Sequence, residues 1–122
     1  MTNTARALYY FASSFGWNAY PETSVPRNAQ LPYITYTLQE YDWKDTGMLQ
    51  MRLWYRGEDY AALNLKIDQI SLATENGKQV KVNGSDGKLV IYRGRPFCQY
   101  QPVDEENIKV AYLNFDVHYL FD

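Results

Sequence analysis

The sequence is poor in cysteine and in long apolar runs, and each shortage excludes a class of protein. Cys98 is the one cysteine in 122 residues, so the chain can form neither an internal disulfide nor a cysteine-based zinc site. No apolar stretch approaches the ~20 residues that span a bilayer, so we expect no membrane segment. The first residues lack the pattern of a signal peptide, which favours the cytoplasm.

Charge of either sign is also scarce. Lys and Arg number 12 and Asp and Glu 14, which gives a net charge of −2. Nucleic-acid-binding domains are usually basic, so we expect no general affinity for nucleic acid. Apolar residues are plentiful instead, at 46% of the chain, and 12 residues are tyrosine. This composition predicts one folded domain over residues 1–122 with much pleated sheet.

Apolar periodicity indicates two helices and several strands. A helix is expected over about 3–15, and a second one opens at Gly57 with Glu58 and Asp59 in its first turn. The expected strands are 16–20, 31–41, 48–55, 79–82, 88–92, 97–101 and 109–121. The segment 93–96 is expected to break the sheet. The last strand is long enough to predict a bulge or an extended edge position.

This order of elements predicts an α+β fold resembling an α/β sandwich. We expect a mainly antiparallel sheet with two helices packed on one face. The opposite face would be polar and aromatic. The expected core comprises Leu8, Phe11, Phe15, Ile34, Leu53, Leu63, Ile67, Leu113, Phe115 and Val117.

No group of residues predicts catalysis, and we expect no enzyme, cofactor or metal site. His118 and Asp116 are two positions apart on one strand, which separates them by ~6–7 Å. Cys98 has no adjacent base and fits better as a small buried side chain. The run 104–106 is acidic, but a hydrated loop explains it better than a metal site does.

Arginine and aromatic residues are the better candidates for function. Arg, Trp and Tyr are enriched in the centres of protein contacts, although arginine stems also commonly cover sheet faces. The candidate contact residues are Trp43, Arg52, Trp54, Arg56, Tyr92, Arg93 and Arg95. Trp43 lies in a polar loop, where an exposed tryptophan often marks a contact surface.

Several segments together resemble one family. They are Phe15-Gly-Trp-Asn-Ala-Tyr, Leu31-Pro-Tyr-Ile-Thr-Tyr, Leu53-Trp-Tyr-Arg, Arg93-Gly-Arg-Pro-Phe and Val110-Ala-Tyr-Leu-Asn-Phe. In this order, the chain resembles the small tail terminator proteins of tailed bacteriophages and prophages, which are tail-completion proteins. The likeness lies in the combination, because no single segment is diagnostic.

The resemblance implies a structural protein of the virion tail or neck, assembled in the bacterial cytoplasm. It would cap the tail tube as a homo-hexameric ring, end tail elongation and offer an interface to the neck or head-completion protein or to a terminal cap. DNA would pass through the lumen without specific binding. Within such a ring, a neighbouring subunit would contact Arg52, Trp54 and Arg56, the adjacent ring or the tube would contact Trp43, and a second contact would involve Tyr92, Arg93 and Arg95. Arg52→Glu would then abolish ring assembly and leave the fold intact. Two alternatives stay open. One is a neck (head–tail joining) protein or a tail tube subunit, and the other is a small enzyme or ligand-binding protein.

Overall fold

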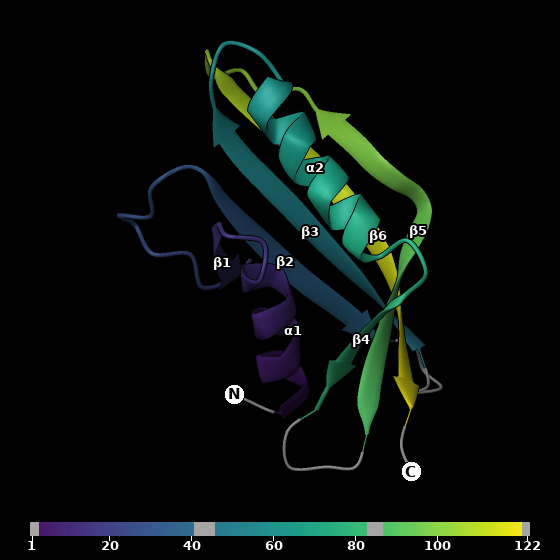
Figure 1. Ribbon diagram of the computed structural model, residues 1–122. Helices are drawn as coiled ribbons and strands as arrows, with labels where there is room; N and C mark the ends of the chain where they lie inside the picture. The colour runs from purple at the N-terminus through teal and green to yellow at the C-terminus, as the bar shows by residue number, and fades with distance from the viewer. Residues whose placement is uncertain (1–2, 41–45, 83–86, 121–122) are drawn as a thin grey trace.

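The computed structural model describes residues 3–40, 46–82 and 87–120 (Figure 1). The helices and strands are α1 (Asn3–Ser13), β1 (Asn18–Pro21), β2 (Tyr33–Glu40), β3 (Thr46–Arg56), α2 (Ala61–Ala73), β4 (Lys78–Lys81), β5 (Lys88–Gln101) and β6 (Ile108–Leu120). Neither helix has the length and apolar run that crossing a membrane requires.

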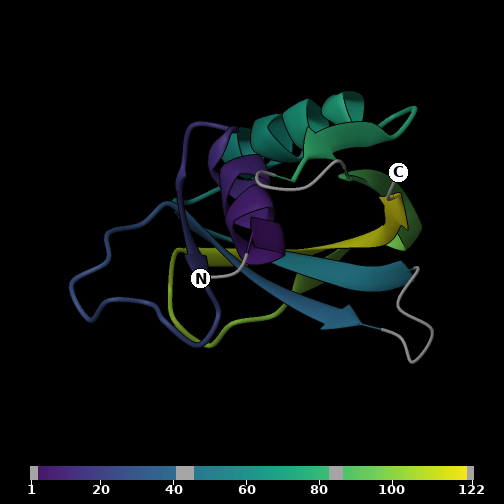
Figure 2. The same cartoon turned by 90° about the horizontal axis from the view of Figure 1, so that it is seen from below.

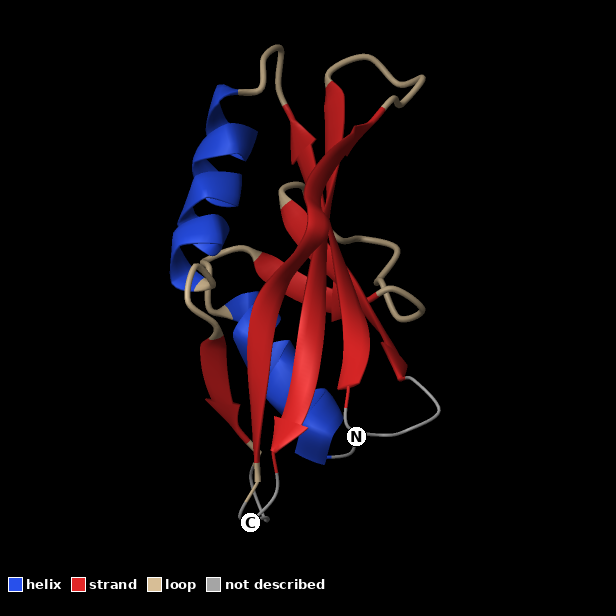
Figure 3. Cartoon of the chain, turned by 90° about the vertical axis from the view of Figure 1, so that its right-hand side faces the viewer, coloured by secondary structure: helices blue, strands red, loops and turns tan. Residues whose placement is uncertain are grey.

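The strands form one six-stranded sheet in the order β1-β2-β3-β6-β5-β4. β1 pairs with β2 in parallel, and the other neighbours are antiparallel. Both helices lie on the same face of this twisted sheet, as Figures 2 and 3 show from two directions. The predicted α+β class, with a mainly antiparallel sheet and two helices on one face, is therefore confirmed.

The core lies between the helices and the covered face of the sheet. All ten residues expected there are buried, and Phe115 at its centre is fully buried. The rings of Phe11 and Phe97 meet Phe115 edge to face, with centroids 5.9 Å and 5.5 Å away. The strict alternation along β6 places apolar side chains on this face at every second residue, which is why the sequence predicts the core well.

The expected start of the second helix is wrong. α2 begins at Ala61, so Glu58 and Asp59 precede the helix instead of occupying its first turn. The Asp59 Oδ1 accepts a hydrogen bond of 3.0 Å from the backbone N–H of Ala61. Free N–H groups at a helix start attract such a side chain from just outside the helix, so the acid supports the helix from a position before it.

The expected break at 93–96 is also wrong, because these residues belong to the continuous strand β5. From Arg93 to Cys98, β5 advances five residues while the paired residues of β6 advance two, from Phe115 to Leu113. The extra residues form a bulge, where β5 bends visibly in Figure 1. A Cβ on Gly94 would lie 2.9 Å from the backbone oxygen of Asn114, so the bulge needs glycine there.

The long strand β6 therefore needs neither a bulge of its own nor an edge position. It lies in the middle of the sheet between β3 and β5. Its length is supported from both sides, by pairing with β3 from Ile108 to His118 and with β5 from Val110 to Leu120. The bulge that the sequence predicts for β6 lies in its neighbour β5 instead.

Candidate interaction surface

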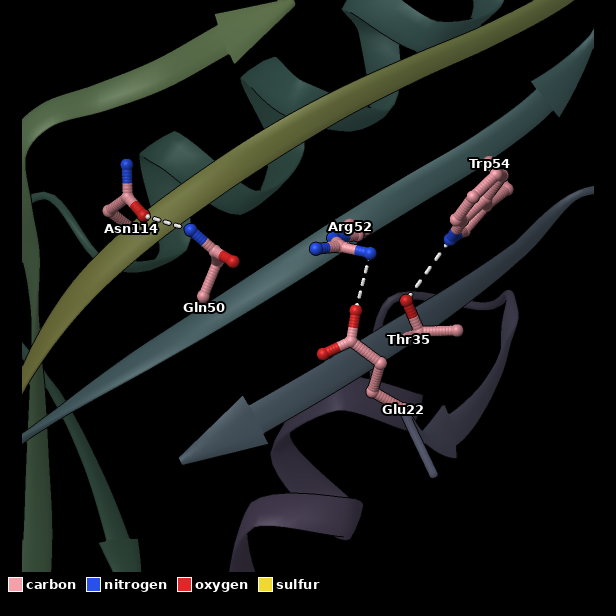
Figure 4. Close-up of polar contacts among 6 residues, drawn as sticks. All are labelled: Glu22, Thr35, Gln50, Arg52, Trp54 and Asn114. Atoms are coloured by element: carbon pink, nitrogen blue, oxygen red, sulfur yellow. Dashed lines mark hydrogen bonds and ion pairs between the residues drawn. The ribbon is translucent and has the colours of Figure 1, made fainter. Parts of the chain in front are cut away.

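The sheet face turned away from the helices, here called the open face, carries most of the candidate contact residues. Directly paired residues share a face of a sheet, and the register aligns Thr35, Arg52 and Tyr112 in one row. Further along, Gln50 pairs with Asn114. Figure 4 shows polar contacts at this face, which join Gln50 to Asn114, Arg52 to Glu22 and Trp54 to Thr35.

Arg52 is held within its own chain. Its guanidinium forms an ion pair with Glu22, which follows β1, and lies 4.6 Å from the centre of the Tyr112 ring. In the described part of the structure its buried Nε has no hydrogen-bond partner. Arg52 therefore ties the chain after β1 to the middle of the open face, which leaves it less free for a neighbouring subunit than the sequence predicts.

Trp54 lies on the open face in β3, which is separated from β1 by β2. Its Nε1–H donates a hydrogen bond of 3.0 Å to the Thr35 hydroxyl, and its ring lies 6.0 Å from that of Tyr33. Tyr33 in turn meets Tyr20 of β1 edge to face at 5.8 Å. Because its only polar atom is satisfied internally, Trp54 presents an oriented apolar ring.

Trp54 and Tyr33 line a cleft of about 280 Å³, here called the aromatic cleft. It lies between the loop that follows β1, the ends of β2 and β3, and the loop that precedes β6. The long β1–β2 loop extends away from the helices in Figure 2. The lining residues are Ala29, Leu31, Tyr33, Trp54, Arg56, Val103, Glu105 and Ile108. Arg56 is exposed at its rim and forms no ion pair within the described residues.

The second predicted group, Tyr92, Arg93 and Arg95, is divided by the fold. Tyr92 lies on the open face, with its ring 5.2 Å from that of His118. Arg93 lies on the helix side, where it donates a hydrogen bond of 2.9 Å to the Ser71 hydroxyl of α2. Arg95 is exposed in the bulge. Consecutive residues of a strand point to opposite faces, so neighbours in sequence do not form one contact.

Trp43 lies outside the described residues, so its predicted role stays a prediction. The sequence also did not single out Asn114, although it joins three strands. Its amide accepts a bond from Gln50 at 3.0 Å and donates to the Pro96 carbonyl at 3.1 Å. Its polarity inside an alternating strand placed it on the open face, but only the bulge brings Pro96 within reach.

No ion pair joins the candidates for chemistry, Asp116 and His118, in the described part of the structure. Asp116 and His118 are both exposed on the open face. Burial raises the pKa of the half-buried Cys98 thiol, which favours the unreactive neutral form at neutral pH. Among residues 3–40, 46–82 and 87–120, no group of three His, Cys, Asp or Glu side chains has the arrangement that could hold a metal ion.

A hollow of about 430 Å³ lies beneath the bulge on the open face. Gln50, Asn114 and Asp116 contribute to it from the sheet, and Arg95 contributes from the bulge. The lining is mixed in charge and the amide groups are already paired with each other. Unlike the aromatic cleft, the hollow has no Trp or Tyr side chain in its lining.

No model of a known protein family matches the chain, and no curated protein sequence matches it either.

Proposed function

We propose that the chain is a structural protein of bacteriophage tail assembly that caps the tail tube as a ring, most simply a homo-hexamer. The resemblance of its segments to tail terminator proteins motivates this proposal. The α+β fold with both helices on one face agrees with the fold that the resemblance implies. In the ring, each subunit would contact the tube on one side and the neck or a terminal cap on the other.

The aromatic cleft is the observation that carries the proposal. A ring requires a heterologous contact, in which one region of a subunit binds a different region of the next. Oriented aromatic rings beside an arginine without an internal partner are typical of the centre of such contacts. Trp54 and Arg56 at the cleft meet this description, whereas Arg52 is already held by Glu22.

The slight excess of acidic over basic residues fits a ring through which DNA slides. Affinity for DNA grows with the number of phosphates that cationic residues neutralise. A chain with a net charge of −2 would offer a lumen of low affinity. An assembled ring whose lumen is strongly basic would contradict this part of the proposal.

Electron microscopy of particles made without this protein tests the proposal. Overlong, irregular tubes without heads would support a terminator. Tails of normal length that fail to join heads would support the neck protein instead, and an absence of tubes would indicate a tube subunit. Unaltered, infectious particles would overturn any role in assembly and favour an enzyme or a ligand-binding protein.

A charge reversal tests the ring contact itself. Arg56→Glu should leave the fold intact, because the side chain is exposed and has no ion pair in the described structure. It should abolish ring formation and reproduce the overlong tubes. Arg6→Glu, at an exposed arginine of α1, is the matched control with the same charge change. Normal tails with a folded Arg56→Glu variant would remove the cleft from the ring contact.

A further inference from the structure

Only the first part of β5 has a neighbouring strand on its outer side, which is the side away from β6. β4 pairs with β5 only from Lys88 to Ile91. Beyond that point, no other strand in the described structure pairs with the outer side of residues 92–101. Their backbone N–H and C=O groups on that side form an open sheet edge, which can bind another extended chain.

The part of this edge up to Pro96 carries the bulge, a proline and two arginines, which hinder strand addition, but the part after Pro96 does not. The run from Phe97 to Gln101 contains no proline and no charged residue. The opposite edge of the sheet is protected by comparison, because β1 has four residues and ends in Pro21. Short strands and proline are common devices against edge pairing, so β5 is the more available edge.

The charges at the two ends of the open edge are complementary to each other. Arg93 and Arg95 lie before the uncharged run, and Asp104 and Glu105 lie after it. Arg95, Asp104 and Glu105 are exposed and form no ion pairs within the described residues. If a second copy of the strand runs antiparallel beside the first, the basic end of each copy meets the acidic end of the other.

We infer that two copies of this chain pair through their β5 edges, antiparallel and centred on Gln99. This register sets Pro96 opposite Pro102 and pairs the five proline-free residues between them. At each end of the contact, Arg95 of one copy then lies near the loop that holds Asp104 of the other. The contact is isologous, so it closes at two copies and extends one sheet through both.

This inference does not rest on the proposed ring function. The ring needs a heterologous contact, assigned above to the aromatic cleft, whereas the β5 contact joins identical edges. Arg56→Glu tests the ring and leaves the β5 edge unchanged. Each proposal can therefore fail alone.

Light scattering after gel filtration tests the pairing, using the full chain over a dilution series. The unaltered chain should show a monomer–dimer equilibrium. Arg95→Glu should weaken the dimer by about tenfold or more, because the twofold axis makes every ion pair occur twice. Asp104→Arg should do the same, and the combined R95E/D104R variant should restore the dimer. Arg6→Glu is the control that should leave the dimer unchanged.

A disulfide test is independent of charge. Residues directly opposite each other in antiparallel strands have Cα atoms ~4.5–5.5 Å apart, which a disulfide can span. The variant C98A/Q99C should form a disulfide-linked dimer on mild oxidation, and C98A/Q30C, with its cysteine in the β1–β2 loop, should not. A chain that stays monomeric throughout would overturn the pairing. So would an oligomer that ignores the charge reversals and does not cross-link at residue 99.

Discussion

The two faces of the sheet are built from the same strands but differ in what holds them. On the helix-covered face, Phe115 and its neighbours are fully buried and make apolar contacts. On the open face, Arg52, Trp54 and Asn114 are only partly buried, and each is held by separate polar or ring contacts with other residues. The covered face accounts for most of the stability, because apolar burial is the dominant favourable term in folding. The open face remains available for recognition.

The largest effect should come from the covered face. Phe115→Ala removes the ring between Phe11 and Phe97 and should lower the free energy of unfolding by about 3–5 kcal/mol. His118→Ala, three residues further on the open face of the same strand, should cost less than about 1 kcal/mol. Denaturant titration of both variants checks the difference. Similar costs would show that the two faces do not divide stability as we describe.

The bulge should be the next most sensitive point. Gly94→Ala places a methyl group 2.9 Å from the Asn114 backbone oxygen, and backbone cannot move aside as a flexible side chain can. We expect a loss of about 1–3 kcal/mol, measured by chemical denaturation. Gln101→Ala, exposed on the same strand, is the control. Unchanged stability in Gly94→Ala would mean that the bulge rearranges freely.

Arg52→Glu should have a smaller effect on stability. The substitution removes the ion pair with Glu22 and the contact with Tyr112, and it brings two carboxylates together. We expect a loss of about 1–2 kcal/mol in a chain that still folds. Glu22→Gln, which removes only the charge attraction, should cost less than about 1 kcal/mol and lose its effect in high salt.

If Arg52 contacts a neighbouring subunit, as the resemblance implies, Arg52→Glu should abolish the ring while the fold persists. The structure adds a rival cause, because the variant also frees the segment after β1. Particle morphology with Arg52→Glu and Glu22→Gln separates the two. If both variants give overlong tubes, Arg52 acts by positioning this segment. If only Arg52→Glu does so, its charge contacts a neighbouring subunit.

The smallest effect should be the pH dependence due to Cys98. Burial raises the pKa of this thiol above its ordinary value. As pH rises through that ordinary value, the unfolded chain loses the proton first, so the free energy of unfolding falls until pH passes the raised native pKa. At lower pH the thiol is protonated in both the folded and the unfolded chain, so it does not change the free energy of unfolding. Denaturant titrations at about pH 7 and about pH 10 measure this. Between the two pH values, the free energy of unfolding should fall more in the unaltered chain than in Cys98→Ala. Equal slopes would contradict the effect of burial.

The elements that the sequence predicts well are those governed by local periodicity. β6 alternates so strictly that its buried face can be identified from Ala111, Leu113 and Phe115 alone. The start of α2 was missed because Glu58 and Asp59 suit both the first turn of a helix and the position before it. The bulge was read as a break because glycine and proline end a strand in most settings.

The candidate site depends on more distant contacts. The open-face position of Arg52 and Trp54 follows from alternation along β3. Their partners Glu22 and Thr35 cannot be identified from the sequence, because pairing between separated strands is decided by the order of the sheet. Side chains alternate between the two faces along β5, so Tyr92 and Arg93 are separated as well. The prediction that they form one contact did not take this alternation into account.

The sequence by itself determined the α+β class, the single sheet with one apolar face, and the identity of the core residues, because these depend on local spacing and side-chain chemistry. Only the tertiary structure decided that β6 is central, that β5 bulges around Gly94, that two loops and the sheet enclose the aromatic cleft, and that the second half of β5 is an open edge. Each of these depends on which distant segments lie side by side, and that is settled by packing the whole chain around one core.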